Sequence, residues 1–250
     1  MKNIFYQAVF RKLCYKLAEN RWIWFLKGLP VLPRAAAMFR AKRYTMTSSV
    51  RCSRLWDSCK QVLDGNISGN FVECGVWKGG SSAIMALAIK DARQERHLHL
   101  FDSFQGLPEP SEKDGELAAA YSSGRNQGKL TTLNQCCAGL DEVRHLILDK
   151  IKVPNELAHF HVGWFQNTIP ADAGRLGPIA LLRLDGDWFD STRICLEHLY
   201  PLLSPGGILI LDDYYSWDGC LKATDEYRQK VDIKCPIHRI DTAAAYWIKA

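Results

Sequence analysis

The feature that most constrains the fold is a series of short apolar segments that alternates with helix-compatible stretches after Gly65. Near-continuous apolar runs of this length are typical of parallel strands that are covered by helices on both faces. The alternation predicts an open, mostly parallel sheet in a doubly wound α/β domain. The five runs are FVECGV (71–76), HLHLFDS (97–103), AHFHVGW (158–164), IALLRLDG (179–186) and GGILILDD (206–213).

The end of the chain departs from this alternation. Two further runs, CPIHRID (235–241) and AAAYWIKA (243–250), follow one another without a helix between them, so we expect an antiparallel edge strand to finish the sheet. Residues 105–135 are polar, with clusters of Gly, Pro and Ser, and are predicted to form a mobile loop or lid on the ligand side. Thr47 or Ser48 is expected to cap a helix.

The beginning of the chain is strongly basic. Residues 1–60 hold thirteen Lys and Arg against two acidic residues, although the whole chain carries a net charge of only +5. We expect residues 1–45 to form a basic helical arm and residues 46–250 to form one domain. The arm could cover the domain or a partner subunit, or it could contact an anionic membrane surface through basic residues near Trp22 and Trp24.

The cysteines and histidines do not indicate a zinc site. The nine cysteines include no CxxC spacing, and the adjacent pair Cys136 and Cys137 does not suit a regular disulfide framework. Three histidines in the predicted strands are expected to be structural: His99, His159 and His161. Since no apolar run reaches the roughly 18 residues that span a bilayer and no signal peptide is evident, we expect a cytoplasmic protein. We also expect that it has no nucleic-acid partner.

The segment FVECGVWKGGSS (71–82) combines a strand, a glycine-rich turn and the start of a helix. Gly75 lets the backbone approach a ligand, and the helix expected to begin at about Ser81 offers free N–H groups, so both are candidate cofactor-binding residues. Glu73 at the end of the strand disfavours a phosphate and suits a ligand with an amino-acid group. The alternative is a glycine turn that serves packing alone.

The second run ends at Asp102, which lies 27 residues after Gly75. An acidic residue at this point can accept hydrogen bonds from both hydroxyls of a ribose. An adenosyl ligand and a nicotinamide dinucleotide would both use it equally well. Asp102 could instead cap the following turn.

Three aspartates end the fourth and fifth runs: Asp185 in RLDGDWFDS, and Asp212 and Asp213 in ILDDYYSW. Neighbouring parallel strands would bring all three to one rim, where their charges would repel unless a divalent cation neutralised them. Carboxylate oxygens favour magnesium, calcium or manganese. The alternative is that Asp187, Asp190 and Asp212 are turn and cap residues.

In five segments, from about residue 45 to 230, the chain resembles the macrocin O-methyltransferase family: VECGVWKGGSS, LFDSFQGLPEP, VGWFQNTIP, LRLDGDWFDST and LYPLLSPGGILILDDY. That family methylates sugar hydroxyls on precursors of antibiotics such as tylosin, mycinamicin and novobiocin. The resemblance implies a seven-stranded Rossmann-like methyltransferase sheet, S-adenosylmethionine as methyl donor, Mg²⁺ or another divalent cation, a small-molecule or glycan acceptor, and a homo-oligomer.

The resemblance also implies roles for particular residues. Glu73 and Gly75 would lie beside the methionine moiety, Asp102 and Ser103 would hold the ribose, and Trp164 would lie near the adenine. The magnesium ligands would be Asp185, Asp212 and Asp213. We expect Asp185 to act as the proton acceptor as well, because a neutral hydroxyl is a poor nucleophile.

Two other classes of function stay open at this point. A nicotinamide-dependent oxidoreductase would use Asp102, but GVWKGG lacks the G-x-G-x-x-G spacing of that class. A non-catalytic, membrane-associated binding module would use the basic arm and would leave the three aspartates without a function.

Overall fold

The structure is a computed structural model that describes residues 31–250. Most of the predicted basic arm, including the tryptophans on which the predicted membrane contact depends, lies outside the described residues. Within residues 31–250, none of the helices combines the length and the hydrophobicity needed to cross a bilayer.

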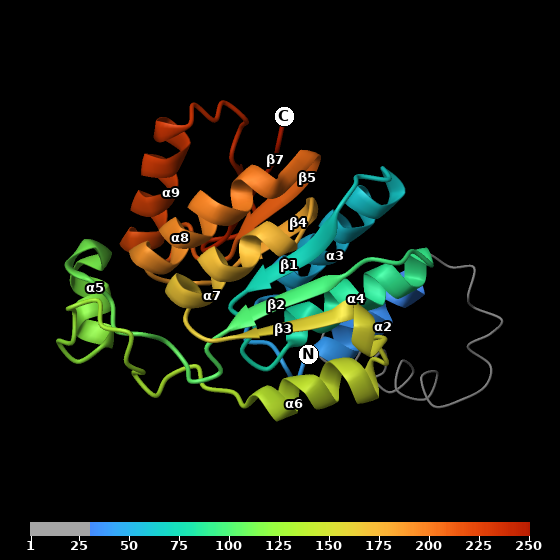
Figure 1. Cartoon of the computed structure of the whole chain (residues 1–250), viewed down its shortest axis with the longest axis horizontal. Coiled ribbons are helices and arrows are strands. Elements are labelled where there is room, and N and C mark those ends of the chain that lie inside the picture. Colours follow the sequence, from blue (N-terminus) through green and yellow to red (C-terminus); the bar gives the residue numbers. More distant parts are fainter. Residues whose placement is uncertain (1–30) are drawn as a thin grey trace, which may run out of the picture.

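One sheet of seven strands forms the centre of the molecule, in the order β3-β2-β1-β4-β5-β7-β6 (Figure 1). Strands β1 to β5 are parallel, whereas β7 is antiparallel to both of its neighbours, β5 and β6. This confirms the predicted fold class, with the antiparallel β7 one position in from the edge and the two-residue β6 outside it. The strands are β1 (Asn70–Cys74), β2 (Leu98–Asp102), β3 (Ala158–Val162), β4 (Ile179–Leu184), β5 (Leu203–Leu211), β6 (His238–Arg239) and β7 (Ala245–Ile248).

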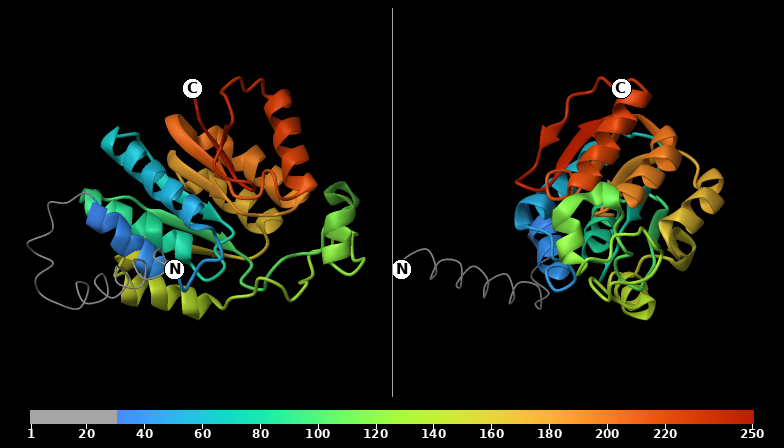
Figure 2. Two further views of the ribbon diagram at one scale, coloured as in Figure 1. Left: turned by 180° about the vertical axis from the view of Figure 1, so that it is seen from behind. Right: turned by 90° about the vertical axis from the view of Figure 1, so that its left-hand side faces the viewer.

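Helices cover both faces of the sheet (Figure 1 and Figure 2). One face packs against α2 (Val31–Ala41), α3 (Ser49–Asp64), α4 (Gly80–Ala92) and α6 (Leu140–Arg144), which continues through one wider turn to Lys150. The other packs against α7 (Phe165–Asp172), α8 (Phe189–Leu199) and α9 (Asp218–Lys230). Alternate residues of each strand serve the two cores, since Phe71 belongs to the first core and Val72 to the second.

The helix predicted after Thr47 or Ser48 is α3. Ser48 is its N-cap, and the Ser48 hydroxyl accepts a hydrogen bond from the Arg51 backbone N–H at 3.2 Å. The preceding α2, which falls within the arm expected over residues 1–45, buries Ala37 and Ala41 in the first core. The described end of that segment is therefore packed against the domain.

The segment over residues 105–135, predicted as a loop, contains a short helix, α5 (Gly115–Tyr121), which stands beyond the carboxyl ends of the strands (Figure 2). The chain just before α5 is held by Asp114, whose carboxylate accepts a hydrogen bond from the backbone N–H of Phe189 at the start of α8. At its end the Tyr121 ring packs edge-on against Trp188 and Trp217. The segment thus contacts the ligand side through specific interactions.

Candidate functional site

A pocket lies at the carboxyl ends of β1, β2, β4 and β5, where parallel α/β sheets bind their ligands. Most of the predicted site residues line it, from five separate segments of the chain. They are Gly75, Asp102, Ser103, Trp164, Asp185, Asp212 and Asp213.

The glycine turn packs directly against the end of β4. Gly75 has a φ of +88°, and a Cβ atom at this position would lie 1.8 Å from the carbonyl oxygen of Asp185. A side chain is therefore excluded by both backbone conformation and space. This close approach brings the turn after β1 and the aspartates after β4 into one pocket.

Asp102 organises the turns that surround the pocket. Its carboxylate accepts hydrogen bonds from the backbone N–H groups of Val76 (2.7 Å), Trp77 (3.0 Å) and Phe104 (2.7 Å). Burial nevertheless raises the pKa of Asp102 above its usual value. The neighbouring Ser103 hydroxyl donates to the Gly106 carbonyl oxygen at 3.0 Å. Asp102 thus joins the turn after β1 to the turn after β2, as the turn-capping alternative expects, and it also lines the pocket.

Two predicted cofactor residues lie behind the pocket wall. Glu73 is fully buried, and its carboxylate accepts hydrogen bonds from Arg183 Nη1 at 2.9 Å and from the Ser82 hydroxyl. Burial raises the pKa of Glu73 to about 7, although Arg183 acts in the opposite direction. Ser81 is also buried and does not line the pocket. Neither residue lines the pocket, and their predicted contact with the cofactor stays a prediction.

Three aspartates bring their carboxylates together at the rim of the pocket. One oxygen each of Asp185, Asp187 and Asp213 lies within 4.8 Å of the others. Burial, followed by repulsion from Asp185, raises the pKa of Asp187 to about 7. Burial, then repulsion from Asp187 and Asp185, raises the pKa of Asp213 well above its usual value.

These carboxylates have the chemistry of a divalent-cation site. Asp213 Oδ2 is buried and receives no hydrogen bond from any of residues 31–250. A buried acceptor without a donor is costly, and so are three crowded negative charges. A hard cation with oxygen ligands would relieve both costs. The residues therefore fit magnesium, manganese or calcium.

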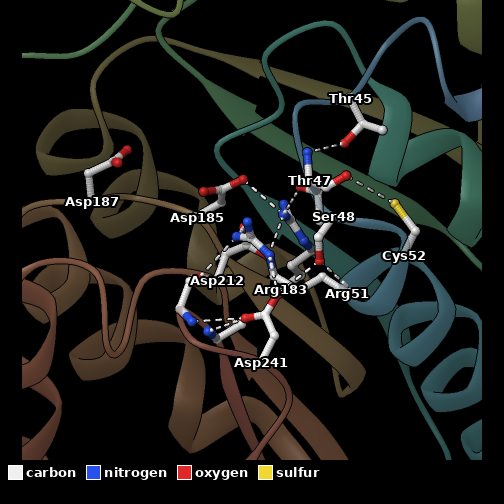
Figure 3. A network of polar contacts seen from close by, with 12 residues as sticks. Thr45, Thr47, Ser48, Arg51, Cys52, Arg183, Asp185, Asp187, Asp212 and Asp241 are labelled. Carbon is white, nitrogen blue, oxygen red and sulfur yellow. Dashed lines mark hydrogen bonds and ion pairs between the residues drawn. The ribbon is translucent and has the colours of Figure 1, made fainter.

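The composition of this cluster differs from the predicted ligand set. Asp212 lines the pocket, but its carboxylate is engaged by two arginines, Arg183 Nη2 at 2.8 Å and Arg51 Nη1 (Figure 3). Asp187, which the sequence offered only as a turn or cap residue, lies beside Asp185 and Asp213. The signal for Asp187 was the D-G-D spacing, which puts a second carboxylate in the same turn.

Arg183 is the other functional residue that was not predicted. It is 2% exposed and forms ion pairs with Glu73 (2.9 Å), Asp185 (2.9 Å) and Asp212 (2.8 Å). One guanidinium thus pairs with three carboxylates from three strand ends. A single arginine in the otherwise apolar run IALLRLDG was the sequence signal for it.

The histidines expected to be structural form a ladder on β2 and β3. His99 Nδ1 lies 3.1 Å from His161 Nε2, and His161 Nδ1 lies 2.7 Å from a carboxylate oxygen of Asp172 on α7. None of His99, His159 and His161 lines the pocket. A catalytic base is therefore to be sought among the aspartates.

Comparisons with known proteins agree with this geometry. The family model described as macrocin-O-methyltransferase (TylF) matches residues 33–249. Demethyldecarbamoylnovobiocin O-methyltransferase from Streptomyces niveus is 34% identical over 209 residues, which cover 83% of this chain and 76% of that protein. A tetracenomycin-C 4'-O-methyltransferase from Streptomyces olivaceus, which acts on a 2,3-dimethoxy-alpha-L-rhamnosyl derivative, is 36% identical over 207 residues, 82% of this chain and 75% of that protein.

A solved structure shows the same relationship. The O-methyltransferase NovP superposes with a TM-score of 0.72 at 32% identity, over 83% of this chain and 82% of its own. The family match covers nearly all of the described residues, including every segment that lines the pocket. The chain therefore belongs to the macrocin O-methyltransferase family and is an S-adenosylmethionine-dependent O-methyltransferase.

Proposed function

We propose that this enzyme methylates a hydroxyl of a sugar unit in a small-molecule or glycan acceptor, with a divalent cation held at the acidic cluster. The relatives described above act on glycosylated natural products, and the cluster of Asp185, Asp187 and Asp213 beside the glycine turn is the observation that carries the proposal. The oxidoreductase and the non-catalytic module are not favoured by any of these comparisons.

In this proposal the cofactor lies over the turn at Gly75, with its ribose near Asp102 and Ser103 and its adenine near Trp164. The sulfonium methyl group then faces the acidic rim. A bound divalent cation would lower the pKa of the acceptor hydroxyl and fix its direction of approach. The protein has to hold the donor and acceptor in line and to receive one proton.

Two aspartates are candidates for that proton. Arg183 Nη2 forms an ion pair with Asp185 Oδ2 at 2.9 Å, so this oxygen of Asp185 is already engaged. No Lys or Arg among residues 31–250 forms an ion pair with Asp187, whose Oδ1 accepts a hydrogen bond from Trp217 Nε1 at 2.9 Å. We therefore propose Asp187 as the base in addition to the predicted Asp185. Asp185 and Asp213 would then be cation ligands.

The test uses purified protein, labelled S-adenosylmethionine and a library of glycosides and glycosylated natural products. The expected result is label transfer to sugar hydroxyls, activation by magnesium, and loss of activity after chelation. Chelator-treated enzyme that turns over at the full rate would remove the cation from the proposal. Labelled products that carry the methyl group on a phenol or a carboxylate would remove the sugar acceptor.

We propose three further properties from the sequence alone. The membrane contact depends on residues outside the described part of the chain. The homo-oligomer and the cytoplasmic location are likewise proposed from the sequence, and the oligomeric state can be measured by light scattering.

A further inference from the structure

The segment before α3 forms one wall of the pocket. Met46 and Thr47 line the pocket together with the glycine turn. The backbone N–H of Gly80 donates to the Tyr44 carbonyl oxygen at 2.9 Å, and a Cβ atom at Gly80 would lie 2.5 Å from that oxygen. The beginning of this wall, residues 44–47, is therefore seated directly on the turn that the cofactor is proposed to contact.

The other end of the wall is held by four polar residues, which we call the clasp: Ser48, Arg51, Asp212 and Asp241 (Figure 3). The Ser48 hydroxyl donates to Asp241 Oδ2 at 2.8 Å. Arg51 Nε forms an ion pair with the same oxygen at 3.2 Å, and Arg51 Nη1 contacts both the carboxylate and the carbonyl oxygen of Asp212. The first turn of α3 is thus attached to the acidic rim and to the C-terminal hairpin.

The two carboxylate oxygens of Asp241 have separate partners. Oδ1 accepts the backbone N–H groups of Ala243 (2.9 Å) and Ala244 (3.0 Å), which shapes the turn before β7. Oδ2 faces Ser48 and Arg51. The hairpin turn does not require Oδ2, so that oxygen is available to fix α3.

We propose that Arg51 and Asp241 are positioning residues that hold the wall of residues 44–47 against the glycine turn and so strengthen cofactor binding. Arg51 spans the gap between Asp212 at the end of β5 and Asp241 in the C-terminal hairpin, and it belongs to the same helix turn as the cap Ser48. Without it, the first turn of α3 would lose its contact with Asp212 at the rim, and this end of the wall would keep only the Ser48 bond to Asp241 and the Arg183 bond to Thr47 Oγ1. The inference rests on the proposed cofactor site.

The test compares Arg51→Gln, Asp241→Asn and the double variant in the full chain, with S-adenosylhomocysteine binding measured by calorimetric titration. Asp241→Asn keeps Oδ1 for the hairpin turn but replaces Oδ2 by an amide N–H₂, which cannot accept from Ser48 and carries no negative charge to pair with Arg51. Arg54→Gln is the matched control, because Arg54 lies one turn later on α3, contacts Ser58, Gln61 and the ring of Tyr246 on β7, and does not line the pocket.

Each single variant is expected to bind S-adenosylhomocysteine about tenfold more weakly, the effect of losing one charge-assisted contact. The double variant is expected to lose less than the sum of the two single losses, because both changes break the Arg51–Asp241 ion pair. Arg54→Gln should bind like the wild type. Lower melting temperatures with unchanged affinity in both single variants would reduce the clasp to a structural role and overturn the proposal. Fully additive losses would also overturn it, whereas a wild-type protein that does not bind S-adenosylhomocysteine would contradict the cofactor site itself.

Discussion

Glu73 on β1 and Arg183 on β4 are direct neighbours in the parallel sheet, and Arg183 Nη1 lies 2.9 Å from Glu73 Oε1. Both side chains are nearly inaccessible to solvent. The pair stands behind the pocket, and the same guanidinium extends to Asp185 and Asp212 at its rim. The charge balance of the rim therefore depends on a buried pair that does not itself touch the pocket.

Arg183→Met is expected to destabilise the protein strongly, by about 3–5 kcal/mol, because it leaves Glu73 as an uncompensated buried charge. Chemical denaturation measures the loss. The combination Glu73→Gln with Arg183→Met should recover part of the free energy of unfolding, since the buried charge is then gone. A double variant that is less stable than Arg183→Met alone would contradict this account.

Asp187→Asn is expected to lower kcat by roughly 10²–10⁴-fold, the usual cost of losing a general base. Binding of S-adenosylhomocysteine should be unchanged, because the cofactor is proposed to rest on the turns at Gly75 and Asp102. Asp185→Asn, examined in parallel, should lower kcat and also weaken activation by magnesium. Initial rates against magnesium concentration, with calorimetry for the cofactor, distinguish the two. Full activity of Asp187→Asn would return the role of base to Asp185.

Asp213→Asn is expected to change the magnesium requirement, whereas Asp212→Asn is expected to change mainly the stability of the protein. Asp213 has a carboxylate oxygen without a donor at the cluster, so its amide should bind a hard cation more weakly and raise the magnesium concentration needed for half-maximal rate. Asp212 pairs with two arginines, so Asp212→Asn should mainly lower the melting temperature of the cation-free protein. If Asp212→Asn instead shifts the magnesium requirement as much as Asp213→Asn does, Asp212 belongs in the ligand set as the sequence predicted.

The elements that the sequence predicted well are those with local causes. Apolar runs of strand length, the cap at Ser48 and the glycine turn at Gly75 each depend on a few neighbouring residues, and the structure contains all of them. The positions at which the strands end then follow from the ends of the apolar runs. Because parallel strands end at one edge of the sheet, the sequence predicted Asp185, Asp212 and Asp213 at one rim, and all three line the pocket.

The details that the sequence missed depend on register and side-chain direction. Glu73 lies opposite Arg183 because β1 and β4 pair in one particular register, and its carboxylate bonds to Arg183 and Ser82 behind the pocket. The sequence predicted Asp212 as a cation ligand. Its pairing with Arg51 left no local signal, because Arg51 lies 161 positions earlier in the chain. Asp241 had no motif around it. Tertiary ion pairs of this kind leave no periodic signal in a single sequence.

The imidazole of His99 gives a pH dependence of stability that can be isolated by mutation. Burial, and then the neighbouring His159, His161 and His97, lower the pKa of His99 to about 3. In the unfolded chain its pKa would be about 6.5. Between these values the unfolded state binds more protons, so the contribution of His99 to stability is complete above about pH 6.5 and is lost as the pH falls toward 3.

His99→Gln removes this contribution while keeping a side chain that can hydrogen-bond to His161. Wild type and variant share every other titrating group, so their difference in free energy of unfolding reports His99. That difference should shift against the wild type by about 1.4 kcal/mol for each pH unit below 6.5. Urea denaturation at pH 7.5, 6 and 5 measures it. Parallel stability profiles for the two proteins would show that His99 already carries its proton in the folded state, and that the ladder on β2 and β3 is a charged one.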